Sequence, residues 1–431
     1  MSKISANPLH WVRLDNAAKI YPAARRRNWS NLFRQSVTLK EDVDTEVLHS
    51  VLEVVIKRFP SIAACLQTGM FWYYLQQVRS TPEIKEEYSY PLVHMNNAEM
   101  RKCAFRVIVH RNRIAIEFFH SLTDGTGALI FLKNLTAEYL EQKYGVSIPL
   151  EHGILDRHAT PTAEELEDCF PKNAGPVPLP RKDTNAWQLD GEAQHDGFLH
   201  VTCFKIPVKD AIQKAHEHGA TLTVFMSAVM MRALLDLQNE KNPHRKHQKR
   251  VKLLIPVNLR KLYGAKTLRN FAMYVIPELD PRLGEYDFDE ICKIITHKLG
   301  AEFTAKHMSR IIAANVGSEQ NPIIRVIPLP IKNIVMKAVF NSVGEIKSCL
   351  TLSNMGAVKV PDVMAEYVER FDFILGVQAT APYNCGMLSY GDTIYLNFIR
   401  DVKDADLERH FWNTLQNLGL SAEVESNRNE R

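Results

Sequence analysis

One histidine of this 431-residue chain stands in a pattern that suits proton transfer. His120 is followed at the fourth position by Asp124 and then by Gly125, between a β-rich run that ends at Phe119 and a helical pattern over 128–144. Imidazole has an unperturbed pKa close to neutrality, so it can accept and return a proton under physiological conditions. We therefore predict that His120 is a general base and that Asp124 orders its loop through an ion pair.

The spacing alone has low information, because a histidine before such a triplet is more often structural. Its neighbours add weight to a catalytic role. Phe119 and Leu122 are apolar and would keep the imidazole partly dry, which favours its neutral form until it acts as a base. Gly125 and Gly127 are expected to allow backbone conformations that other residues resist.

The elements that must position this loop alternate between helical and extended patterns. Apolar spacing predicts helices over 41–57, 128–144, 209–218, 223–237, 287–308 and 331–343. Runs rich in β-branched and aromatic residues predict strands over 71–75, 105–110, 113–119, 199–206, 251–257, 371–377 and 393–399, and near 350. The predicted fold class is therefore α/β with mixed sheets.

A proline-rich stretch divides the chain. Five prolines and two glycines between 161 and 191 interrupt the periodic pattern, and so long a loop is uncommon inside one compact domain. We place a linker at 171–198, between an N-terminal half at 1–170 and a C-terminal half at 199–431. Each half is long enough to bury a hydrophobic core.

Composition and charge exclude several classes of protein. A content of 45% hydrophobic and 24% charged residues is typical of a soluble globular protein. The net charge of +4 is too small to predict nucleic-acid binding. Seven scattered cysteines without a CxxC pair predict free thiols in a reducing compartment and no metal site. Without a signal peptide or a transmembrane segment in the pattern, we expect a cytoplasmic protein.

The histidine loop and three later motifs resemble the chloramphenicol-acetyltransferase-like superfamily. That superfamily includes alcohol acetyltransferases, plant BAHD acyltransferases, polyketide-associated acyltransferases and the condensation domains of nonribosomal peptide synthesis. The matching segments are IAIEFFHSLTDG at 114–125, IPVNLR at 255–260 followed by TLRNF at 267–271, LSNMG at 352–356, and CGMLSY at 385–390 followed by a strand at 393–398. Four motifs in matching order are far more specific than the histidine spacing alone.

The resemblance implies two chloramphenicol-acetyltransferase-like halves that form a V-shaped pseudo-dimer with a tunnel between them. His120 would take the proton from a hydroxyl or amine acceptor as it attacks an acyl thioester. Asp124 in such enzymes is chiefly structural, and Arg260 is the candidate partner of its ion pair, unless Arg260 merely covers the end of a strand. Ser389 and Asn354 are the candidate oxyanion donors, unless residues 353–354 only form a turn.

The departures from the family patterns favour a stand-alone acyltransferase. Phe119 replaces the first histidine of the condensation motif, the DFGWG motif of the plant enzymes is missing, and no carrier module is expected within the chain. We expect acyl-CoA as co-substrate, a small alcohol or amine acceptor, no bound cofactor, and a monomer. The candidates for contact with coenzyme A phosphates are Lys246, Lys249 and Arg250, although such a run is often only a solvated loop.

Two alternatives to a CoA-dependent enzyme stay open. One is a condensation-type enzyme that uses thioesters bound to a separate carrier protein. The other is a catalytically silent binding protein of the same fold, which the intact His120 argues against. The apolar helix predicted at 331–343 has sparse lysines, so it either packs in the core, walls a lipophilic tunnel or contacts a membrane surface.

Overall fold

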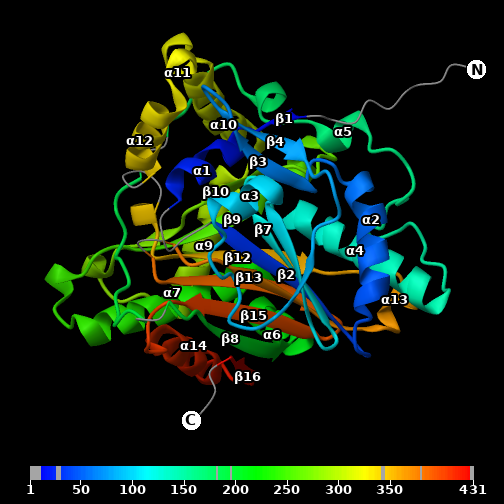
Figure 1. Ribbon diagram of the computed structural model, residues 1–431. Helices are drawn as coiled ribbons and strands as arrows, with labels where there is room; N and C mark the ends of the chain where they lie inside the picture. The colour runs from blue at the N-terminus through cyan, green and yellow to red at the C-terminus, as the bar shows by residue number, and fades with distance from the viewer. Residues whose placement is uncertain are drawn as a thin grey trace, which may run out of the picture.

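Two large β-sheets organise the chain, and helices cover them (Figure 1). The computed structural model describes residues 11–25, 31–180, 183–194, 197–340, 345–378 and 381–427. The first large sheet has the spatial strand order β13 (Val368–Leu375), β2 (Leu32–Leu39), β7 (Arg113–Phe119), β6 (Phe105–His110) and β5 (Ile84–Glu86). A small separate sheet contains β1 (Val12–Arg13), β4 (Tyr73–Gln77) and β3 (Ala64–Thr68).

The second large sheet belongs to the C-terminal part of the chain. Its spatial order is β10 (Ala272–Val275), β9 (Val251–Asn258), β12 (Leu350–Ala357), β14 (Tyr383–Tyr390), β15 (Thr393–Arg400), β8 (His200–Pro207) and β16 (Glu423–Ser426), and β11 (Glu278–Leu279) also pairs with β9. β12 is parallel to both of its neighbours, β9 and β14. The carboxyl ends of these three strands therefore lie at one edge of the sheet.

A strand exchange joins the two halves. β13 follows β12 in the sequence, yet it pairs with β2 of the first sheet, from Val368 opposite Leu39 to Leu375 opposite Phe33. The two sheets also approach closely, because a Cβ atom on Gly386 of β14 would lie 2.4 Å from the carbonyl oxygen of Phe373. The second half of the sequence thus completes the sheet that the first half builds, and the division at 171–198 stays a prediction.

Two cores form around long buried helices. In the first, α4 (Gly125–Tyr144) packs with α2 (Thr45–Arg58) against β2, and in the second, α7 (Leu222–Lys241) contacts α6 (Val208–Glu217), α9 (Phe288–Glu302) and α14 (Asp406–Asn417). The remaining helices are α1 (Ile20–Ala24), α3 (Asn97–Lys102), α5 (Ala163–Leu166), α8 (Arg260–Tyr263), α10 (Ala305–Gln320), α11 (Pro322–Val326), α12 (Leu329–Val339) and α13 (Asp362–Ala365). Within the described ranges no single helix has the length and hydrophobicity to cross a membrane, although α6 and α7, bent by 82° at their junction, have them together.

The structure confirms most of the predicted elements and corrects three. The helix predicted at 287–308 is two helices, because the side chain of Thr304 caps a new helix by accepting from the N–H of His307. Residues 353–354 lie in strand β12 and not in a turn. The helix predicted at 128–144 begins at Gly125. The end of the helix predicted at 331–343 lies outside the described residues.

Candidate active site

His120 lies directly after β7, in the loop that leads to α4. Its backbone N–H donates to the carbonyl of Asn31, which anchors the loop to the chain entering β2. The ring of Tyr21 from α1 stacks on the imidazole with centroids 4.4 Å apart, and Phe33 meets it at a steep angle at 5.0 Å. Burial by these neighbours lowers the pKa of His120 below its ordinary value, although Asp124 and Asn270 act in the opposite direction.

The hydrogen bonds of Asn270 select one tautomer of His120. The side-chain amide of Asn270 donates to the Asp15 carboxylate at 3.3 Å, so its carbonyl oxygen faces the imidazole. Nδ1 of His120 lies 3.2 Å from that oxygen and must donate to it. Nε2 is then the unprotonated nitrogen, and no residue of the described ranges forms a hydrogen bond with it. This is the protonation state that a general base requires.

Asp15 fixes the orientation of the amide. Its buried carboxylate accepts from the backbone N–H groups of Ala18, at 2.8 Å, and Asn270, at 3.3 Å. Burial raises the pKa of Asp15 to about 6, and the guanidinium of Arg269 opposes that rise. At neutral pH the carboxylate is therefore ionised and acts only as an acceptor, which keeps the Asn270 amide turned as described.

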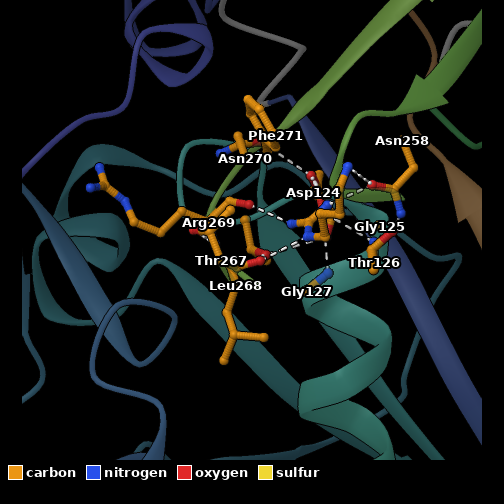
Figure 2. Close-up of polar contacts among 12 residues, drawn as sticks. Asp124, Gly125, Thr126, Gly127, Asn258, Thr267, Leu268, Arg269, Asn270 and Phe271 are labelled. Carbon is orange, nitrogen blue, oxygen red and sulfur yellow. Dashed lines mark hydrogen bonds and ion pairs between the residues drawn. The ribbon is translucent and has the colours of Figure 1, made fainter. Parts of the chain in front are cut away.

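Asp124 is the N-cap of α4 and one half of a buried ion pair. One carboxylate oxygen accepts from the backbone N–H groups of Thr126 and Gly127, both at 3.1 Å, and the other accepts from Phe271 at 2.8 Å (Figure 2). The guanidinium of Arg260 donates to both oxygens, at 2.9 and 3.0 Å. The structure therefore brings together the two residues for which the resemblance implied an ion pair.

Arg260 also holds the loop that carries Asn270. Its guanidinium donates to the carbonyl oxygens of Thr267, at 2.7 Å, and Arg269, at 2.6 Å. The hydroxyl of Thr123 donates to the carbonyl of Leu268 at 2.6 Å, so the histidine loop is bonded to the same segment. The ion pair thus sets the position of Asn270 relative to His120.

Two glycines permit close packing here, and the expectation about their backbone freedom is wrong. Neither Gly125 nor Gly127 has a positive φ. Instead, a Cβ atom on Gly127 would lie 2.2 Å from the carbonyl oxygen of Leu268, and one on Gly125 would lie 2.7 Å from the sulfur of Met355. The first turn of α4 can therefore approach the backbone of the 267–271 loop only because residue 127 has no side chain, whereas the Met355 side chain could shift to make room at residue 125.

The two candidate oxyanion donors lie at the sheet edge that meets α4. Asn258, at the end of β9, donates to the hydroxyl of Thr126 at 3.0 Å, which places this edge beside the helix N-terminus. The Asn354 amide donates to the Thr223 hydroxyl at 2.9 Å, and Ser389 lies opposite Ala357 at the end of β14. Over the described ranges, neither candidate has a hydrogen bond to His120.

The predicted phosphate-binding residues lie at the other end of β9. With about 3.3 Å per residue, the eight-residue strand separates them from Asn258 by roughly 25 Å. Lys246 and Lys249 are exposed there. Arg250 instead pairs with Glu278 at 2.5 Å and with Asp280 at 3.4 Å. The structure thus does not bring these three residues to the imidazole.

Sequence reasoning missed Asp15, Tyr21 and the role of Asn270. Asn270 falls inside the TLRNF motif, so the resemblance contained a signal for it, whereas nothing in the pattern marked Asp15 or Tyr21. In the part of the chain that the structure describes, no group of three or more His, Cys, Asp or Glu residues is arranged to hold a metal ion.

Comparisons with known proteins agree with this architecture. No family model and no curated protein sequence matches the chain. Among solved structures, TRI101 of Fusarium sporotrichioides, complexed with coenzyme A and T-2, has a TM-score of 0.64 at 11% identity and covers 96% of this chain and 99% of its own. The first condensation domain of the calcium-dependent antibiotic synthetase has a TM-score of 0.60 at 14% identity, with 96% of each chain covered.

A third solved structure extends the comparison to polyketide-associated proteins. Polyketide synthase associated protein 5 from Mycobacterium tuberculosis has a TM-score of 0.59 at 12% identity and covers 95% of this chain and 98% of its own. Together these structures confirm the predicted fold class: the chain shares the mixed α/β fold of TRI101, of the condensation domain and of polyketide synthase associated protein 5.

Replacing Asp124 should destabilise the protein strongly. Asp124→Asn removes the charge that faces the buried Arg260, and breaking such a pair costs about 3–5 kcal/mol of unfolding free energy. Asp44→Asn is the matched control, because Asp44 caps α2 through the N–H groups of Glu46 and Val47 and lies in the exposed start of that helix. Asparagine caps as well as aspartate. Equal losses in the two variants, measured by denaturant unfolding, would show that the ion pair with Arg260 adds nothing beyond the loss of a charge at a helix cap.

Proposed function

We propose that this protein is an acyltransferase that moves an acyl group from a thioester to a hydroxyl or amine acceptor. The observation that carries the proposal is the unprotonated Nε2 of His120. The hydrogen bond with Asn270 fixes this tautomer, and the imidazole ring is half-buried. The superfamily fold supports it, because the solved neighbours include a protein described as an acetyltransferase and condensation domains. The acceptor is a small alcohol or amine.

In the proposed reaction, His120 carries one proton between two groups. Nε2 takes the proton from the acceptor as its oxygen or nitrogen attacks the thioester carbonyl carbon, and a tetrahedral oxyanion forms. The carbon–sulfur bond then breaks, and the imidazolium returns the proton to the thiolate that leaves. The acyl group passes directly to the acceptor, so a covalent acyl-enzyme is unnecessary and the kinetics should be sequential.

Ser389 is the stronger of the two oxyanion candidates. The Asn354 amide already donates to Thr223, and its carbonyl oxygen accepts from Gly356, so both ends of this side chain are engaged. Ser389 is half-buried at the same edge of the sheet, and its hydroxyl has no hydrogen-bond partner among the described residues. A hydroxyl donor at this edge would stabilise the charge that develops on the carbonyl oxygen.

We further propose coenzyme A as the carrier of the acyl group. Lys246 and Lys249 are exposed and form no ion pair with the described residues, so they are better candidates for its phosphates than the paired Arg250. A donor bound there must extend along the length of β9 to reach the histidine loop. Two alternatives remain: a thioester donor on a separate carrier protein, and a catalytically silent protein. The tests below distinguish both from a CoA-dependent enzyme.

Removing the imidazole should abolish most of the activity. The purified protein is incubated with acetyl-CoA and a panel of alcohols and amines, and release of the free thiol is measured. His120→Ala should lower the turnover at least 100-fold, the lower end of what a positioned general base contributes. His49→Ala, at an exposed position on α2, should be unaffected. A variant that keeps more than a tenth of the activity would exclude His120 as the base.

Loss of Asn270 should impair catalysis in a way that pH reveals. Asn270→Ala removes the hydrogen bond that fixes the tautomer of His120, so kcat should fall about tenfold to 100-fold with KM little changed. The Asn270 contact also raises the pKa of His120, which burial holds below 6.5. The acid limb of the pH profile of kcat/KM should therefore lie below pH 6.5 and move further down in the variant. A proportional loss at every pH would indicate a purely structural role.

Coenzyme A should bind the protein measurably in calorimetric titrations, and more weakly at high salt. The double change Lys246→Ala with Lys249→Ala should lower the affinity and flatten the salt dependence, because charge-assisted contacts to phosphate would be lost. Lys57→Ala, in the exposed last turn of α2, is the control. Failure to bind at millimolar coenzyme A, or isolation of a stable acyl-enzyme, would favour the carrier-protein mechanism.

A further inference from the structure

The polarity of helix α12 is reversed relative to an ordinary surface helix. Three of its exposed side chains are large and apolar: Ile331, Ile334 and Val335 are 55%, 71% and 53% exposed, and their spacing of three and four residues puts them on one face. The polar Lys332 is 2% exposed, and Asn333 is half-buried. In an isolated soluble protein the hydrophobic effect favours the opposite arrangement.

Contacts with the β3–β4 hairpin hold the helix in this orientation. The ammonium of Lys332 donates to the carbonyl oxygen of Phe71 at 2.8 Å and lies 3.5 Å from the centre of the Trp72 ring. The Asn333 amide donates to the hydroxyl of Tyr73 at 2.9 Å. Rotating α12 to bury its apolar side would break all three contacts. These contacts therefore stabilise the orientation in which the apolar face points outward.

The hairpin tip and the preceding helix extend the same surface. The backbone N–H of Leu329 donates to the carbonyl oxygen of Met70, which joins α12 to the tip. Of thirteen large apolar side chains exposed in the described residues, six belong to what we call the α12 patch: Met70, Phe71, Val326, Ile331, Ile334 and Val335. In Figure 1, α11 and α12 lie at the periphery of the molecule. Such a concentration marks an interaction surface.

Charge identifies the partner. The sequence has no Asp or Glu between Glu319 and Glu345, whereas it has the exposed Arg325 and Lys337. A second copy of the chain on a two-fold axis would bring these positive charges against their own counterparts. An anionic lipid surface is complementary to them, and its acyl region accepts the apolar side chains.

We propose that the α12 patch docks on the surface of a bilayer that contains anionic lipids, with its apolar side chains inserted at the boundary between headgroups and acyl chains. The docking does not depend on the proposed reaction. The patch is nevertheless linked to the candidate active site, because α12 packs on α1, and Tyr21 of α1 stacks on His120. The histidine loop thus lies one short helix behind the docking face.

Vesicle flotation tests the docking directly. Wild-type protein should float with vesicles made of equal parts phosphatidylcholine and phosphatidylglycerol, less with phosphatidylcholine alone, and less at high salt. The double change Ile334→Glu with Val335→Glu should lower the bound fraction at least tenfold. Leu283→Glu is the matched control, because Leu283 is 82% exposed but lies on the loop after β11, and it should leave binding unchanged.

The outcomes separate this proposal from its rivals. The melting temperatures of all variants are compared first, and Ile331→Ser with Ile334→Ser replaces the glutamate pair if that pair unfolds. Absence of wild-type flotation, or flotation that the α12 variants retain, would overturn the proposal. A wild-type dimer in solution that the variants convert to a monomer would instead assign the patch to a second copy. None of these measurements needs an acyl donor, so failure of the proposed reaction would not affect them.

Discussion

The buried pair of Asp124 and Arg260 is the interaction on which the rest of the site depends. Removing two charges from water is costly, and the cost is offset here because every oxygen of the carboxylate accepts hydrogen bonds and the guanidinium also binds two carbonyl groups. One ion pair thereby joins the start of α4, helix α8 and the 267–271 loop. Without it, fewer bonds would hold the histidine loop against the segment that carries Asn270, chiefly the bond from the Thr123 hydroxyl to the carbonyl of Leu268.

The chemistry is therefore divided between the halves of the chain. His120 comes from the first half and Asn270 from the second, 150 residues later, while Asp15 lies 255 residues before the amide that it orients. His120 acquires the tautomer with an unprotonated Nε2 only when the two halves have packed. A site assembled in this way exists only in the complete fold.

Local patterns in the sequence predicted the local structure well. Runs of β-branched and aromatic residues predicted the hairpin strands β6 and β7, and the histidine motif predicted the loop between β7 and α4. β2 escaped detection because Arg34 is a charged residue in a buried strand, where it pairs with Glu117 at 2.7 Å. Asp15 and Asn270 act through contacts between distant segments, which no spacing rule contains. The polarity of α12 was equally hidden, since a periodic pattern does not say which face is covered.

The exchange of β13 also has a consequence for synthesis on the ribosome. β2 emerges early, but the strand that covers its free edge is made more than 300 residues later. At about 5–20 residues per second, that edge stays unpaired for roughly 15–65 s. Unpaired strand edges are templates for aggregation. The nascent N-terminal half thus passes through a long period in which a chaperone, or slow collapse around α2 and α4, must protect it.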